Sequence, residues 1–228
     1  MKLCMIGTGY VGLVSGTCFA DIGNQVYCVD KDRSKIDKLN SGVSPIYEPG
    51  LDELIKKNYN ANRLIFTTDI KKAINSSDLI FICVGTPTKK GSLKVDLSFV
   101  YKCSKEILKH TKKKKIIITK STVPVGTGDE IEKIIKKKKK LFSVISNPEF
   151  LREGEAIRDF RYPDRIVIGS DNKNEFKTMR KLYSPLISKG AKFFTTSRKA
   201  AELIKYASNA FLATKITFIN ELANLCEK

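Results

Sequence analysis

The stretch Lys2-Leu3-Cys4-Met5-Ile6-Gly7-Thr8-Gly9-Tyr10-Val11-Gly12 decides the fold. A short, mostly apolar run of strand length leads into glycines with the spacing GxGxxG, and a segment with helical periodicity follows. In dinucleotide-binding folds the first glycine permits a tight turn, the second lets the backbone approach the pyrophosphate, and the third allows close packing of helix on strand. We therefore expect residues 1 to about 125 to bind a dinucleotide at Gly7, Gly9 and Gly12.

The acidic residue Asp30 follows the next predicted strand, about 20 residues after the glycine turn. A carboxylate at this place accepts hydrogen bonds from the adenosine ribose and disfavours the extra phosphate of NADP, so we expect NAD. Arg33 and Lys35 lie nearby, and a cation can accommodate that phosphate, which weakens the preference. The alternative is a glycine turn that packs and binds nothing.

Short apolar stretches alternate with longer amphipathic ones along the chain, which is typical of βαβ units and a mostly parallel sheet. We expect strands at Lys2–Ile6, Gln25–Val29, Leu64–Thr67, Leu79–Val84, Lys115–Thr119, Phe142–Ser146, Arg165–Ile168 and Lys192–Phe194. We expect helices at Val11–Ile22, Ser34–Asn40, Gly50–Lys57, Asp69–Asn75, Leu97–Lys109, Thr127–Lys138, Glu175–Leu186 and from Arg198 to the last residue. The predicted fold class is α/β: a Rossmann-type, doubly wound sheet over residues 1–195, followed by the start of a long central helix over residues 196–228.

Composition and charge exclude several classes of protein. No apolar run approaches the roughly 20 residues that a membrane span needs, and the N-terminus does not resemble a secretory signal, so we expect a cytoplasmic protein without a membrane partner. The net charge of +18 raises the possibility of nucleic acid as a partner. Much of this charge lies in two runs, Lys112–Lys115 and Lys136–Lys140, at predicted connections without interleaved aromatic residues. We therefore expect both lysine runs to form solvated surface, and we expect no nucleic-acid site.

The cysteines and the histidine offer no metal site. The six cysteines are scattered singly, without a CxxC pair, so we expect neither disulfides nor structural zinc and interpret most of them as buried apolar residues. The one histidine, His110, lies among lysines near the end of a predicted helix, where an exposed surface residue is expected.

Three loops follow predicted strands at the edge where open α/β sheets bind ligands. The loops Val84–Thr88 and Lys120–Thr127 would lie near the cofactor, although each alone could be an ordinary turn. The third, Asn147–Gly154, carries Glu149 and Glu153 four residues apart. If it is helical, the two carboxylates share a face and could act as an acid–base pair; a surface pair of acids is the alternative.

Taken in order, GTGYVG, VGTPT, KSTVPVGT, NPEFLREG, DFRYPDRIVIG and AELIKYASNAFLATKITFINELA resemble the UDP-glucose/GDP-mannose dehydrogenase family over essentially the whole chain. The resemblance implies oxidation of a sugar-nucleotide primary alcohol to a carboxylate, with two NAD+ and a cysteine that carries thiohemiacetal and thioester intermediates. Within the family the sequence is most similar to members that convert UDP-glucose to UDP-glucuronate. GDP-mannose or a UDP-N-acetylhexosamine is the alternative substrate, and a non-catalytic NAD-binding module is the alternative from another class.

The resemblance also implies roles for individual residues. The expected cofactor contacts are Gly7, Gly9, Tyr10, Val11, Gly12, Asp30, Lys35, Thr86, Pro87, Ser121, Thr122 and Glu153. The expected catalytic residues are Thr122 and Glu149, which handle water and protons, and Lys205 and Asn209, which steady charge on the substrate oxygen. Glu149 would be the base for thioester hydrolysis. The expected substrate contacts are Glu149, Phe150, Leu151, Arg152, Glu153, Lys205 and Asn209.

The family's catalytic cysteine lies in a glycine-rich segment after the long helix, beyond Lys228, and Cys226 is instead interpreted as a helix-packing thiol. The second nucleotide-binding domain is expected beyond Lys228 as well, so we expect the 228-residue chain alone to bind NAD(H) without completing the oxidation. The apolar stripe of the last helix, together with the resemblance, implies a homodimer through that helix.

Overall fold

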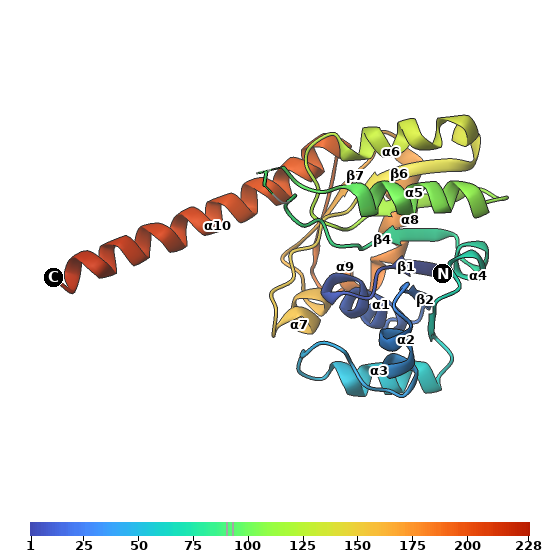
Figure 1. Cartoon of the computed structure of the whole chain (residues 1–228), viewed down its shortest axis with the longest axis horizontal. Coiled ribbons are helices and arrows are strands. Elements are labelled where there is room, and N and C mark those ends of the chain that lie inside the picture. Colours follow the sequence, from blue (N-terminus) through green and yellow to red (C-terminus); the bar gives the residue numbers. More distant parts are fainter. Residues whose placement is uncertain (90, 93) are drawn as a thin grey trace.

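The structure is a computed structural model that describes residues 1–89, 91, 92 and 94–228. Over these residues eight strands form one sheet in the order β3-β2-β1-β4-β5-β6-β7-β8. The strands are β1 (Lys2–Ile6), β2 (Gln25–Val29), β3 (Leu64–Thr67), β4 (Leu79–Ile82), β5 (Lys115–Thr119), β6 (Phe142–Ser146), β7 (Arg165–Gly169) and β8 (Lys192–Thr196). Helices cover both faces of the sheet (Figure 1), so the predicted doubly wound α/β fold is confirmed.

The helices lie between the strands, as the alternating pattern predicts. They are α1 (Tyr10–Asp21), α2 (Arg33–Asn40), α3 (Leu51–Asn60), α4 (Ile70–Ser76), α5 (Ser98–His110), α6 (Thr127–Ile135), the 3-10 helix η1 (Lys136–Leu141), α7 (Ala156–Arg161), α8 (Lys173–Leu182), α9 (Ser184–Ile187) and α10 (Arg198–Cys226). Strand order reverses between β1 and β4, and the glycine turn follows β1 at this place. Open α/β sheets bind ligands at such a switch point.

The sheet changes direction at β7. Strands β1 to β6 are parallel, whereas β7 pairs with β6 in the antiparallel sense through Ser146 and Gly169. Each of these residues is the last of its strand, so β6 and β7 meet at their carboxyl ends. Strand β8 runs parallel to β7. The reversal brings the segment after β6 and the end of β7 together under the start of α10.

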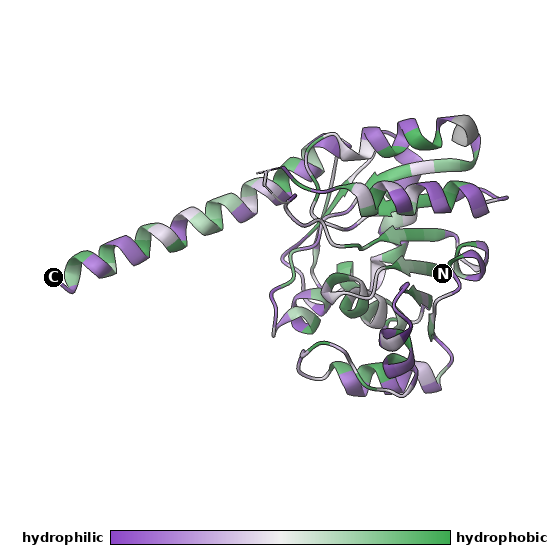
Figure 2. Ribbon diagram, in the orientation of Figure 1, coloured by the Kyte–Doolittle hydropathy of each residue, from purple (hydrophilic) through white to green (hydrophobic). Residues whose placement is uncertain are grey.

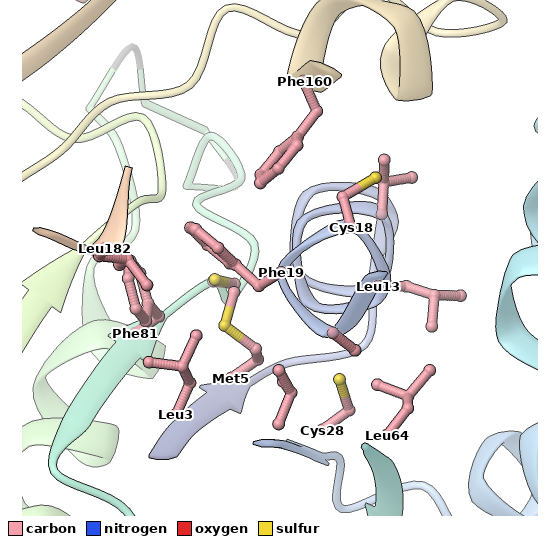
Figure 3. Close-up of a cluster of buried hydrophobic side chains, with 14 of the residues drawn as sticks. Leu3, Met5, Leu13, Cys18, Phe19, Cys28, Leu64, Phe81, Phe160 and Leu182 are labelled. Atoms are coloured by element: carbon pink, nitrogen blue, oxygen red, sulfur yellow. The ribbon is translucent and has the colours of Figure 1, made fainter. Parts of the chain in front are cut away.

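The core has one part on each face of the sheet. Leu3 and Met5 of β1 belong to one cluster, and Cys4 and Ile6 belong to the other, because successive side chains of a strand point to opposite faces. Figure 3 shows the first cluster, in which Phe19 of α1 lies between β1 and Phe160 of α7. A strand that is buried on both faces is expected in a parallel sheet with helices on both sides.

Helix α10 begins in the body and then leaves it (Figure 1). Ser197 caps its start by accepting a hydrogen bond from the Ala200 N–H at 3.2 Å. From Asn209 onward every residue is exposed, and apolar and polar residues alternate along this projecting part (Figure 2). Its large apolar side chains are between 43% and 68% exposed and are Phe211, Leu212, Ile216, Phe218, Ile219, Leu222 and Leu225. Within the described part of the chain, no helix combines the length and apolarity needed to cross a membrane.

Several predicted boundaries are wrong for local reasons. The predicted helix 175–186 is two helices, because Asn172 caps α8 earlier and Pro185 opens α9. The predicted helix 127–138 ends as an α-helix at Ile135 and continues as η1, and β4 ends at Ile82 rather than Val84. Helix α7 was not expected from the pattern.

Two predictions about surface residues are also wrong. Lys115, which we expected in a solvated run, is buried, and its Nζ donates a hydrogen bond to the Ser77 carbonyl. His110 is partly buried rather than exposed and lies 3.2 Å from the Glu106 carboxylate. Lys112, Lys113, Lys114, Lys136 and Lys140 are exposed as predicted, while the side chains at 137–139 lie outside the described residues.

Candidate active site

The three glycines of the turn have different surroundings. Gly7 has a φ of +103°, and a Cβ there would lie 2.8 Å from the Cys83 carbonyl oxygen. A Cβ on Gly12 would lie 1.9 Å from the Gly7 carbonyl oxygen. A Cβ on Gly9 would have no described atom within 4 Å. Packing therefore requires glycine at positions 7 and 12, whereas a Cβ at position 9 would point into open space.

Asp30 ties the end of β2 to the glycine turn. The Thr8 N–H and hydroxyl donate to its Oδ2 at 2.9 and 2.8 Å, and the Asp32 N–H donates to Oδ1 at 3.1 Å. Burial raises the pKa of Asp30, but these hydrogen bonds and the nearby Lys35 charge outweigh it and hold the pKa below the ordinary value. The carboxylate is therefore ionised and fixed beside the turn.

The loops after β4 and β5 are joined by side-chain hydroxyls. The Thr86 hydroxyl donates to the Thr122 carbonyl at 2.8 Å, and the Ser121 hydroxyl donates to the Val84 carbonyl at 2.6 Å. Thr86 and Thr122 are half-buried, and Pro87 is exposed. The two loops therefore form one surface beside the glycine turn.

Glu149 and Lys205 form a nearly buried ion pair from distant parts of the sequence. Lys205 Nζ of α10 lies 3.0 Å from Glu149 Oε1, and the two side chains are 8% and 10% exposed. The Leu151 N–H donates to Glu149 Oε2 at 2.7 Å. Lys205 Nζ and the Arg165 guanidinium both lie over the Phe150 ring, at 5.3 and 4.3 Å from its centre. Asn209, one turn further along α10, is exposed.

The segment 147–154 is not helical, so the expectation that Glu149 and Glu153 share a helical face is wrong. Glu149 points inward to Lys205, whereas Glu153 is exposed. Arg152 is held by Asp159, with Nη2 2.7 Å from Oδ1. Glycine at 154, with a φ of +88°, and proline at 148 interrupt the helical periodicity that the spacing of the acids imitates.

A cavity of about 570 Å³ opens beside the Glu149 side chain. Its lining comes from the segments 147–152 and 158–166, with Lys120, Tyr183 and Leu186 at its inner end. One lining residue contacts α1, because the Tyr10 hydroxyl donates to the Arg152 carbonyl at 3.4 Å. The cavity is therefore lined by Glu149 of the ion pair and by Arg152, which contacts Tyr10 in the first turn of α1.

Lys120 is a buried cation that the sequence analysis did not single out. It is 5% exposed and lines the cavity, and its Nζ has no hydrogen bond or ion pair with another residue in the described part of the chain. Burial lowers its pKa, while the nearby Cys83 and Glu149 oppose that shift. Its place in KSTVPVGT, directly after an apolar strand, was the available signal.

The cysteines do not supply a nucleophile at this place. Cys4, Cys18, Cys28 and Cys83 are buried, and burial raises the pKa of the Cys83 thiol to about 12. Cys103 on α5 is half-buried, and burial raises the pKa of its thiol to about 11. Cys226 is exposed near the outer end of α10. All six are free thiols, and no group of residues that could hold a metal ion is found among the described residues.

Two buried charges hold α10 against the body and so position Lys205. Glu202 accepts hydrogen bonds from the Gly126 N–H at 2.7 Å, the Gly128 N–H at 2.8 Å and the Ser146 hydroxyl at 3.1 Å. Arg198 forms ion pairs with Asp129, Glu132 and Asp171. Because β7 ends in glycine, α10 packs closely on it: a Cβ on Gly169 would lie 2.6 Å from Ala201 Cβ.

Comparisons with known proteins agree with this geometry. Residues 1–187 match the NAD binding domain of the UDP-glucose/GDP-mannose dehydrogenase family, and residues 199–228 match the central domain of that family. The UDP-glucose 6-dehydrogenase of Rhizobium meliloti is 54% identical over 232 residues, which cover 100% of this chain and 53% of that protein. The UDP-glucose 6-dehydrogenase of Bacillus subtilis is 52% identical over 230 residues, covering 100% of this chain and 49% of that protein.

Solved structures show the same similarity. A GDP-mannose dehydrogenase from Pseudomonas aeruginosa superimposes with a TM-score of 0.92 at 37% identity, covering 97% of this chain and 52% of that one. A UDP-glucose dehydrogenase from Pyrobaculum islandicum gives a TM-score of 0.91 at 37% identity, covering 96% and 51%. The chain spans about half the length of the curated relatives it matches. It belongs to the UDP-glucose/GDP-mannose dehydrogenase family.

Proposed function

We propose that this chain binds NAD(H) on its glycine turn and forms the NAD-binding part of an enzyme that oxidises UDP-glucose to UDP-glucuronate. The observation that carries the proposal is the Glu149–Lys205 ion pair beside a cavity whose wall residue Arg152 contacts Tyr10 at the start of α1. Binding NAD requires neither residue, so a non-catalytic NAD-binding module does not account for the pair. The curated relatives of Rhizobium meliloti and Bacillus subtilis bear the name UDP-glucose 6-dehydrogenase.

The residues present fit a dinucleotide. The open side of Gly9 leaves room for a pyrophosphate, and the free N–H groups of Tyr10, Val11 and Gly12 at the start of α1 would face its charge. Asp30 would accept the ribose hydroxyls beside Lys35. NAD+, when bound, supplies the acceptor for the hydride. The remaining proposed cofactor contacts line the loops at the same sheet edge: Gly7, Thr86, Pro87, Ser121, Thr122 and Glu153.

The proposed substrate would lie over Phe150, Leu151, Arg152 and Glu153. Lys205 and Asn209, an ammonium and an amide one helical turn apart, would donate hydrogen bonds to the oxygen on which charge develops. Thr122 and Glu149 would handle water and the proton, with Glu149 the base that activates water for thioester hydrolysis. We propose that the thiol of that thioester comes from outside residues 1–228, since the buried thiols, the half-buried Cys103 and the exposed Cys226 do not fit. We also propose a division at residue 195, with 196–228 contributing the helix through which two copies pair.

Titration with dinucleotides tests the first part. We expect the chain to bind NADH more tightly than NADPH, because the ionised Asp30 repels a ribose phosphate. Asp30→Asn should reduce the difference between the affinities for NADH and NADPH. Asp52→Asn, which alters an exposed carboxylate on α3, should leave that difference unchanged. Equal affinity for NADH and NADPH in the unaltered chain would contradict the assignment of Asp30.

An activity assay tests the second part and uses the protein at the length of its curated relatives. UDP-glucose should support reduction of two NAD+ per molecule oxidised, and Lys205→Met and Glu149→Gln should both abolish it. GDP-mannose belongs in the same assay, because a GDP-mannose dehydrogenase is structurally as similar as a UDP-glucose dehydrogenase. Turnover of GDP-mannose alone would replace the proposed substrate, and NADH binding without turnover of any sugar nucleotide would favour the non-catalytic alternative.

A further inference from the structure

Glu48 is a buried carboxylate at which three separate segments meet. It is 6% exposed and precedes α3. Its Oε2 accepts hydrogen bonds from the Tyr10 hydroxyl and from the Gly154 N–H, the latter at 2.9 Å, and its Oε1 accepts one from the Ile157 N–H at 3.3 Å. The Gly154 N–H also lies 2.9 Å from the Tyr10 hydroxyl oxygen. We call Tyr10, Glu48, Gly154 and Ile157 the Glu48 latch.

Local backbone geometry fixes both sides of the latch. Gly50 has a φ of +79° and caps the start of α3, and the Leu51 N–H donates to the Glu48 carbonyl at 3.1 Å. Gly154 has a φ of +88° with open space around a hypothetical Cβ, so the turn itself, and not packing, requires glycine there. Between these two turns, the Glu48 side chain and the Gly154 N–H both contact the Tyr10 hydroxyl. Neither the spacing nor the periodicity of the sequence indicates this contact.

The latch connects the two binding regions of the proposed function. Tyr10 follows Gly9 directly and opens α1, whose first N–H groups would face the pyrophosphate. Gly154 ends the loop Phe150–Glu153, which would lie beside the sugar nucleotide. Further along, this segment is fixed to α1 in other ways: Phe160 packs edge-on against Phe19 at 4.9 Å (Figure 3), and Arg161 lies 2.9 Å from Asp21. The end of the loop nearest to the cofactor therefore depends on the latch.

We propose that Glu48 is a positioning residue that couples dinucleotide binding on the glycine turn to the order of the substrate loop 150–154. This inference rests on the proposed function, because it takes the turn as the cofactor site and the loop as the substrate site. A dinucleotide that fixes the first turn of α1 also fixes the Tyr10 hydroxyl. Through Glu48, that hydroxyl restrains the N–H groups of Gly154 and Ile157.

The substitution Glu48→Gln keeps the volume of the side chain but not its chemistry. The carboxylate accepts on both oxygens, whereas an amide has one oxygen and one NH2 group. Either orientation of the new amide would place its NH2 group against a donor of the latch. Asp52→Asn is the matched control: Asp52 accepts a hydrogen bond from the Ser44 N–H in the same part of the chain, and among the described residues it has no hydrogen bond or ion pair with the loop.

Amide hydrogen exchange of Gly154 and Ile157, measured by NMR with and without saturating NADH, tests the coupling. In the unaltered chain and in Asp52→Asn we expect NADH to slow exchange of Gly154 by about tenfold, the scale of one charge-assisted hydrogen bond. In Glu48→Gln the ratio of rates with and without NADH should fall to about one, while NADH still binds. If Glu48→Gln fails to fold, Tyr10→Phe serves instead, because it removes the hydroxyl and leaves both N–H contacts of Glu48. In Tyr10→Phe the ratio of the Gly154 exchange rates with and without NADH should also fall to about one.

The outcomes separate the latch from the proposed function. If NADH does not bind the unaltered chain, the proposed function is overturned together with the latch. If NADH binds but does not slow Gly154 exchange, the coupling alone is overturned. If Glu48→Gln only lowers thermal stability and speeds exchange equally with and without NADH, Glu48 holds the fold and does not couple the sites.

Discussion

The glycine turn and the Glu149–Lys205 pair are built by opposite means. The turn is a run of neighbouring residues whose shape comes from missing side chains: a Cβ on Gly7 or Gly12 would meet an atom under 3 Å away, whereas a Cβ on Gly9 would lie in open space. The pair joins two charged side chains from a loop after β6 and from α10, held by Glu202 and Arg198. A local site therefore depends on backbone shape, and a site assembled from distant segments depends on buried charges.

The largest effect should come from Gly12→Ala. A Cβ at this place would lie 1.9 Å from the Gly7 carbonyl oxygen, so the turn or α1 must move, and we expect a loss of about 4 kcal/mol or more of unfolding free energy. Gly9→Ala is the matched variant, since its Cβ meets no described atom within 4 Å. It should change stability by less than about 0.5 kcal/mol yet weaken NADH binding. Urea unfolding and NADH titration of both variants would show this, and equal stabilities would mean that the two glycines do not differ in role.

Lys205→Met should come next, because it leaves the Glu149 carboxylate nearly buried without its cation. We expect a loss of about 3 kcal/mol of unfolding free energy. The double variant Lys205→Met with Glu149→Gln should recover much of that loss, since no uncompensated charge remains. A double-mutant cycle by urea unfolding measures the coupling. Additive losses would show that the two side chains do not stabilise one another.

Lys120→Met should have the opposite sign. The variant removes a buried cation that has no hydrogen bond or ion pair in the described part of the chain, so we expect the unfolding free energy to rise by about 1–2 kcal/mol. A thermal unfolding curve is sufficient to measure it. A decrease in stability would mean that the ammonium group is stabilised by its surroundings.

The smallest effect is the pH dependence of the difference in unfolding free energy between Lys120→Met and the unaltered chain. Burial lowers the pKa of Lys120 in the folded chain below its value of about 10.4 in the unfolded chain. Between these values the unfolded chain binds more protons, so the contribution of Lys120 to the unfolding free energy becomes more favourable as pH rises. The stability advantage of Lys120→Met should therefore shrink as pH rises over the range between the lowered pKa and about pH 10.4. A constant advantage across that range would argue against a lowered pKa.

The sequence predicts the glycine-turn region well because its signals are local. The strands Lys2–Ile6 and Gln25–Val29 and the glycine spacing agree with the structure, and the doubly wound class follows from the alternating pattern. The predicted helix boundaries are wrong where a single residue starts a helix, as Asn172 does for α8 and Pro185 does for α9. The roles of the site residues in binding and catalysis stay predictions.

The second region could not be derived in the same way. The resemblance brought Glu149 and Lys205 to attention, but their contact depends on the reversal of β7 and on the packing of α10 against Gly169. The four-residue spacing of Glu149 and Glu153 indicated a helical pair that does not form. The hydrophobic periodicity of the sequence does not indicate Glu48, Lys120 or Glu202. A charged residue is identified as buried only when its neighbours in the folded chain are known.

The projecting helix α10 is supported near its inner end, so Lys205 lies close to the support and Cys226 lies far from it. Its closest support is Ala201 on Gly169. Lys205 lies about 6 Å beyond that point and Cys226 about 37 Å beyond it, at about 1.5 Å per residue. If the helix tilts as a rigid rod, a displacement of about 3 Å at its outer end moves Lys205 by only about 0.5 Å. The outer part can therefore move considerably while the lysine stays on Glu149, and a small tilt of the helix about Ala201 is correspondingly magnified at the far end.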